Sequence, residues 1–191
     1  DSKERRAAQT VMYNILLNLV KLSAPIIVHT AEEVWSAIGF KDEDVSSVHL
    51  TTFPKCDATW IDNSLNEKWE KLINIKTDVA RELEKMRAAK LIGNSLEASV
   101  NLYTENEELW QFLKSYEKDL PMIFIVSEVR LDRNSTPKAV KGELTQELWI
   151  ECSVSQHKKC ERCWNFRESV GLNQDHPTIC DRCIRAIQQS G

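Results

Sequence analysis

The sequence contains Cys160-Glu161-Arg162-Cys163 and, after sixteen further residues, Cys180-Asp181-Arg182-Cys183. A gap of two residues lets both thiolates of a pair turn toward one ion. Two such pairs, separated by roughly 15–20 residues, are typical of a tetrahedral four-cysteine zinc site. Because four thiolates fill the coordination sphere, we predict one structural zinc ion bound by Cys160, Cys163, Cys180 and Cys183. Such binding can supply about 10–16 kcal/mol to a segment too small for a core of its own. Residues 156–191 are therefore predicted to be a zinc-finger module.

Other uses of these cysteines fit less well. A disulfide framework is typical of secreted domains, and no secretory signal opens the chain. A redox Cys-x-x-Cys would leave the pairing of two motifs unexplained. His157 or His176 could replace one ligand, although four thiolates already satisfy the ion. The remaining cysteines, Cys56 and Cys152, are interpreted as ordinary thiols.

Charge is distributed unevenly along the chain. Residues 156–191 carry six basic and four acidic side chains, a net +2, whereas the whole chain has a net charge of −4. The finger interleaves basic and aromatic residues, which can grip phosphate and stack on unpaired bases. Candidate RNA contacts are Arg162, Trp164, Phe166 and Arg167. In the alternative interpretation, the basic residues balance the thiolates and Trp164 packs on the zinc site as a small core.

The rest of the chain predicts an α+β protein, mainly a helical bundle followed by a small α/β junction. Apolar residues repeat at helical spacing in residues 3–38, and Thr30 and Glu33 form a candidate capping box. Residues 1–62 are thus predicted to be part of a bundle with a linker that holds a short extended piece at 48–53. Residues 63–93 form a long bundle helix, whose apolar residues we expect to pack on the first helix. Residues 94–155 form the junction, with strands at 96–102, 122–131 and 147–154 and a helix at 105–116.

Several functions are excluded by composition. The five glycines are too far apart to share a phosphate-binding loop of the dinucleotide or Walker type. The longest apolar run, residues 15–22, is interrupted by Asn18 and Lys21 and cannot span a membrane. No histidine stands in a motif with a nucleophile or a second base. We therefore predict no catalytic residues in this chain.

Three stretches resemble bacterial-type isoleucyl-tRNA synthetase, a class I aminoacyl-tRNA synthetase family. The stretch from Arg5 to Trp35 resembles its anticodon-binding bundle, and the stretch from Arg81 to Ala98 resembles the following helix and strand. The stretch from Lys159 to Cys183 resembles its C-terminal zinc finger. The resemblance implies a tRNA-binding region of an ATP-dependent isoleucine–tRNA ligase, joined to a catalytic body that uses ATP and Mg²⁺. The family's HIGH and KMSKS motifs do not occur here, so this region is not expected to activate isoleucine.

The resemblance also implies a monomer without membrane contact, in the cytoplasm or, for an organellar parent, in the mitochondrial matrix. Two other interpretations stay open. A similar finger closes the formamidopyrimidine family of DNA glycosylases, although those enzymes resemble this chain only over the finger. The finger and the junction could also form a zinc-stabilised interaction module within a larger protein.

Overall fold

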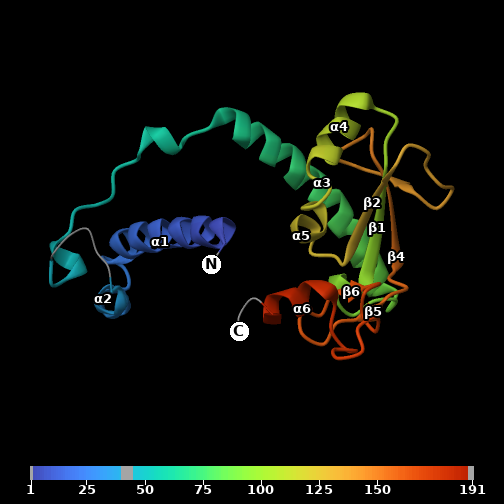
Figure 1. Ribbon diagram of the computed structural model, residues 1–191. Helices are drawn as coiled ribbons and strands as arrows, with labels where there is room; N and C mark the ends of the chain where they lie inside the picture. The colour runs from blue at the N-terminus through green and yellow to red at the C-terminus, as the bar shows by residue number, and fades with distance from the viewer. Residues whose placement is uncertain (1, 40–44, 189–191) are drawn as a thin grey trace. The chain divides into compact units, whose positions relative to one another are not determined.

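The computed structural model describes residues 2–39 and 45–188, and its contacts separate residues 1–62 from residues 63–191. The first unit has helices in its described part, and the second combines helices with sheets (Figure 1). The predicted α+β class is confirmed. Residues 40–44 of the predicted linker and 189–191 of the predicted finger lie outside the described residues. No helix in the described part is long and apolar enough to cross a membrane.

The first unit is built on two helices, α1 (Lys3–Ser23) and α2 (Val28–Ala37). The Ser2 side chain caps α1 by accepting a hydrogen bond from the backbone N–H of Arg5 at 3.2 Å. A small core holds the two helices and the 3₁₀ turn η1 (Val48–Leu50) together. Its buried members are Val20, Ala24, Ala31, Trp35, Ile38 and Val48. A second 3₁₀ turn, η2 (Ala58–Trp60), follows.

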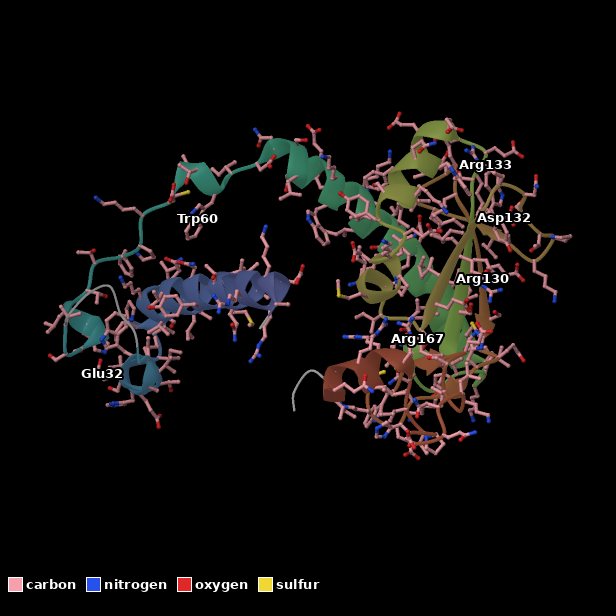
Figure 2. The ribbon with its side chains drawn as sticks, viewed as in Figure 1. Glu32, Trp60, Arg130, Asp132, Arg133 and Arg167 are labelled. Carbon is pink, nitrogen blue, oxygen red and sulfur yellow. The ribbon has the colours of Figure 1, made fainter. Side chains whose placement is uncertain are left out.

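The capping box predicted at Thr30 is wrong, because the N-cap of α2 is Ile27, three residues earlier. Glu32 instead holds the next turn. Its carboxylate accepts hydrogen bonds from Ser47 Oγ at 2.8 Å and from the backbone N–H of Val48 at 3.2 Å. Figure 2 labels Glu32 on α2. These bonds favour a 3₁₀ turn in place of the extended piece predicted for 48–53.

The second unit has a mixed four-stranded sheet in the order β2-β1-β4-β3. Strand β1 pairs with β2 in parallel and with β4 antiparallel, and β3 pairs antiparallel with β4. The 3₁₀ turn η3 (Ser95–Glu97) precedes the sheet. The strands are β1 (Ala98–Tyr103), β2 (Glu128–Asp132), β3 (Val140–Lys141) and β4 (Trp149–Val154), with helices α3 (Asn63–Ala88), α4 (Glu107–Ser115) and α5 (Leu120–Phe124).

The strand predicted for 122–131 is wrong over its first half, where the chain forms α5. Pro121 stands in the first turn of this helix, a position that proline favours. Ile125 ends α5 in the left-handed conformation, with φ 59° and ψ 49°. The apolar run therefore turns twice before β2 begins at Glu128.

Helix α3 buries one face in the core of the second unit. Leu72, Ile75 and Val79 are at most 1% exposed and pack with residues of the sheet, α4 and α5. From its spacing, this apolar face was predicted to pack on the first helix of the chain. In the structure the sheet covers it, whereas Leu65 and Trp69, nearer the start of α3, are almost half exposed.

A buried carboxylate fixes α3 to the turn before β4. Asp78 is 3% exposed and accepts backbone N–H bonds from Glu143, Leu144 and Thr145, at 2.8–3.2 Å. Arg81 adds an ion pair at 3.1 Å. Gly142 is required in this turn, because a Cβ there would lie 2.6 Å from the Thr145 carbonyl oxygen. The hydrogen-bond network therefore depends on Asp78 of α3 and on a glycine at position 142.

Candidate metal centre and its surroundings

The four cysteine sulfurs of residues 160–183 converge on one point. All four Sγ atoms lie within 4.8 Å of one another. The Sγ atoms of Cys160 and Cys183 are 3.8 Å apart, and those of Cys163 and Cys180 are 3.7 Å apart. Four sulfurs at about 2.3 Å from a tetrahedral zinc ion lie about 3.8 Å from one another. The arrangement therefore fits zinc, whereas a disulfide needs about 2.05 Å.

Secondary structure places the two cysteine pairs. The first pair lies in the turn between β5 (Lys158–Lys159) and β6 (Phe166–Arg167), which form a short antiparallel ladder. Cys160 closes this turn by donating its N–H to Asn165 O at 2.9 Å and by accepting that of Trp164 at 2.8 Å. The second pair flanks the start of α6 (Asp181–Gln188), so Cys180 and Cys183 face the same side of the helix end.

Burial and backbone N–H groups shift the pKa values of the cysteine thiols in opposite directions. Burial alone would raise the pKa of Cys160, but N–H groups of Cys163, Cys180 and Arg162 lower that pKa to about 6. The N–H of Cys180 is 3.3 Å from the Cys160 sulfur. Burial raises the pKa of Cys180 to about 12 and also raises that of Cys183. A bound cation supplies the positive charge that lets such buried thiols ionise.

The finger is docked on the sheet by buried polar contacts. Ser127 is 2% exposed, and its hydroxyl donates to Leu96 O at 2.5 Å while accepting the N–H of Phe166 at 2.7 Å. The backbone N–H of Ser155 donates to Glu97 O at 2.7 Å. The Ser127 hydroxyl thus fixes β6 to the segment between α5 and β2, and the Ser155 bond fixes the end of β4 to η3. The finger and the junction therefore form one unit.

The structure separates the four candidate RNA contacts into two places. Trp164 is 57% exposed, with the Lys159 ammonium 4.9 Å from its ring centroid, and it lies outside the buried cluster around the cysteines. Burial raises the pKa of Cys183, and the Arg162 side chain acts in the opposite direction on that pKa. Phe166 and Arg167 line a cavity of about 330 Å³ on the docked side of the finger.

These positions bear on the two interpretations left open by the sequence. Trp164 is too exposed to be a small core on the zinc site. The effect of Arg162 on the pKa of Cys183 is compatible with either role of that arginine. Sequence reasoning missed Lys159, although it directly precedes the first cysteine. Its cation–π contact adds a positive charge beside the exposed indole.

Comparisons with known proteins agree along the chain. A family model described as "Anticodon-binding domain of tRNA ligase" matches residues 1–102, more than half of the chain. A second, described as "Zinc finger found in FPG and IleRS", matches residues 158–186. The finger match alone does not separate these two classes of protein, but the match over residues 1–102 favours the tRNA ligases.

Curated relatives are similar over almost the whole chain. Isoleucine–tRNA ligases of Geobacter sulfurreducens, Thermoanaerobacter sp. and Brachyspira hyodysenteriae are 42%, 41% and 39% identical to it. Each alignment covers 98% of this chain but 20% of the relative, so the chain spans about a fifth of the length of these relatives.

Geometry and similarity lead to the same metal. The finger match and the converging sulfurs confirm one structural zinc site in residues 160–183. The helices and first strand that precede it carry the tRNA-ligase match. The chain belongs to the family of anticodon-binding domains of tRNA ligases.

Proposed function

We propose that this chain is the tRNA-binding C-terminal region of an isoleucine–tRNA ligase. The observation that carries the proposal is the identity of about 40% to isoleucine–tRNA ligases, continuous over 98% of the chain. In the parent enzyme, residues outside this sequence would join isoleucine to tRNA with ATP and Mg²⁺. The present residues would hold the tRNA near its anticodon.

The zinc site has a supporting role in this proposal. Cys160, Cys163, Cys180 and Cys183 each supply one thiolate to the ion. The ion fixes the turn that carries Arg162 and Trp164 and the strand that carries Phe166 and Arg167. Chemistry at the metal is not required, because four protein ligands leave no position for a substrate.

Trp164 is the central contact in the proposed RNA surface. Its exposed ring can stack on an unpaired base, and the Lys159 ammonium beside it can contact a phosphate. Arg162 is the second proposed phosphate contact of this turn. Phe166 contributes as a half-buried residue of β6, and Arg167, on the same strand, lines the cavity beside α5. The positive residues are few, so specific stacking carries more of this binding than charge.

Binding of labelled RNA tests the function. We expect the zinc-loaded chain to bind an isoleucine tRNA transcript more tightly than the same transcript with a changed anticodon, measured by fluorescence anisotropy. Duplex DNA of equal length is the control for nonspecific charge. Equal affinity for all three nucleic acids would contradict the proposal.

A single tryptophan separates stacking from folding. Trp164→Ala should weaken binding of the isoleucine tRNA about tenfold, since stacking on an aromatic residue is worth about 1–3 kcal/mol per base. Trp110→Ala is the matched control, because Trp110 lies on α4, outside the finger and outside the residues 1–102 that match the anticodon-binding family. Zinc content should stay at one ion per chain in both variants. Loss of zinc from Trp164→Ala would mean that the residue supports the finger.

Oligomeric state and cellular location belong to the same proposal. The chain should be monomeric, which sedimentation at micromolar concentration can check. The parent enzyme should act in the cytoplasm, or in the mitochondrial matrix if it is organellar. Neither property affects the assignment of the tRNA surface.

A further inference from the structure

A cavity of about 460 Å³ lies between α5 and the finger, on a side of the finger that Trp164 does not line. Figure 1 shows α5 and α6 in the same unit, and Figure 2 labels Arg167 where the finger meets α5. The volume of the cavity is in the range of small-ligand sites, about 300–1,000 Å³. The walls combine apolar residues of the α5 segment with three cationic side chains, Lys118, Arg167 and Arg182, and one carboxylate, Asp119.

Two of these cations differ from the paired arginines of the same unit. Arg185, on the same helix as Arg182, donates to Asp181 at 2.9 Å, and Arg133 donates to Glu107 at 2.7 Å. Over residues 2–39 and 45–188, by contrast, neither Lys118 nor the Arg182 side chain has a hydrogen bond or an ion pair. Three positive side chains against one carboxylate give the cavity a net positive lining, which favours an anionic ligand.

The apolar wall contains a residue in a costly conformation. Ile125 has φ 59°, where a β-branched residue is a rare exception and glycine is usual. The next residue, Val126, is 1% exposed, but Ile125 shows 55% of its surface and Met122 shows 74%. Ile125 thus keeps an unfavourable backbone without burying its side chain. Such violations of local preference concentrate at binding sites.

We infer that this cavity binds one nucleotide of a single-stranded stretch of RNA. The phosphate would contact Arg167 and Arg182, and the face of an unstacked base would lie on Met122 and Ile125. A phosphodiester supplies the anion that the cations need, and the base supplies the flat apolar surface that the exposed side chains fit. The inference rests on the proposed function and adds a second RNA contact, apart from Trp164.

Two arginines on α6 provide a matched test. Arg182→Gln and Arg185→Gln make the same chemical change three residues apart, but Arg185 does not line the cavity. We expect Arg182→Gln to weaken binding of a fluorescein-labelled isoleucine tRNA transcript about tenfold at fixed salt, and Arg185→Gln less than twofold. Equal losses in both variants would mean that only overall charge matters and would overturn the assignment.

Ile125→Gly tests the apolar wall with a change that relieves the backbone. The variant should melt at the same or a higher temperature, because glycine adopts this conformation freely. Its affinity for the same transcript should nevertheless fall about fivefold. Affinity equal to wild type in both Arg182→Gln and Ile125→Gly would overturn the nucleotide site. If the wild-type chain still preferred the isoleucine anticodon, the proposed function would stand. Loss of that preference in the wild-type chain would overturn both.

Discussion

The two units of the chain differ in how their apolar residues are used. In the second unit, Leu72 of α3 is fully buried in a core that the sheet, α4 and α5 complete. In the first unit, Leu19 of α1 is 59% exposed, and Val11, Ile15 and Leu22 on the same helix are each more than half exposed. Helical spacing of apolar residues therefore marks a face that can be buried, but does not identify what buries it.

The comparison also separates two sources of stability. Residues 63–154 form a core of ordinary side-chain packing, whereas the finger has only a small buried cluster around its cysteines. In its described part, the first unit has a core of six buried residues and an exposed apolar face on α1, which suits its proposed place in a larger helical bundle. The variants below test each part, in order of expected effect.

Zinc removal should have the largest effect, and only on the finger. Chelation should release one zinc per chain and unfold residues 158–188, because the metal supplies about 10–16 kcal/mol to such a segment. The amides of α3 and β1 should stay protected, since their core is apolar. Hydrogen exchange by mass spectrometry, with a zinc indicator dye, measures both. Absence of zinc, or unfolding of the whole chain in one step, would refute this division.

A matched pair of leucines compares the two helices directly. Leu72→Ala should lower the free energy of unfolding by about 3 kcal/mol, because it leaves a cavity in a closed core. Leu19→Ala should lower it by less than about 0.5 kcal/mol, since this side chain is mostly in water. Urea denaturation of the zinc-loaded chain gives both values. Similar losses would mean that the α1 face is covered in solution.

Asp78 tests the polar contact between α3 and the turn before β4. Asp78→Asn should cost about 2 kcal/mol, because an amide cannot accept all three backbone N–H bonds and its own N–H₂ faces donors. The control is Asp57→Asn, which changes an exposed cap that accepts the N–H of Thr59. Asparagine caps about as well as aspartate, so the control should be near neutral. Equal stability of both variants would show that the buried network contributes little.

How much of this could be predicted depends on the range of the signal. The two Cys-x-x-Cys pairs indicated the zinc site, because the ligands of each pair are local and one loop joins them. Alternating residues around Val100 likewise predicted β1. The spacing on α3 predicted a helix correctly, but its partner depends on residues far along the chain. The sheet that covers Leu72 could not be inferred from that helix.

Helix ends were harder to predict, because unusual conformations compete with residue preference. Gly93 was predicted to end α3, but the helix ends at Ala88. Two residues later, Lys90 has φ 55°, and the Leu91 N–H donates a hydrogen bond to Met86 O. Ile125 does the same at the end of α5. Neither lysine nor isoleucine is a residue type that predicts a left-handed conformation. The cavity beside Ile125 could not be predicted either, because Lys118 and Arg182 come together only in the folded unit.

Cys152 gives the smallest effect, and one that depends on pH. Burial, with the charges of Glu82 and Glu151, raises its pKa from 9.0 to about 12. The folded chain therefore holds this proton more tightly than the unfolded chain. Its contribution to the free energy of unfolding is full well below pH 9 and declines between pH 9 and 12, by about 1.4 kcal/mol at pH 10. Cys152→Ala should remove that part of the pH dependence, measured by urea denaturation at pH 8 and pH 10.

At pH 8, iodoacetamide should label the exposed Cys56 well before Cys152. An unchanged pH slope in Cys152→Ala, or equal labelling, would show that β4 shields this thiol no better than the first unit shields Cys56.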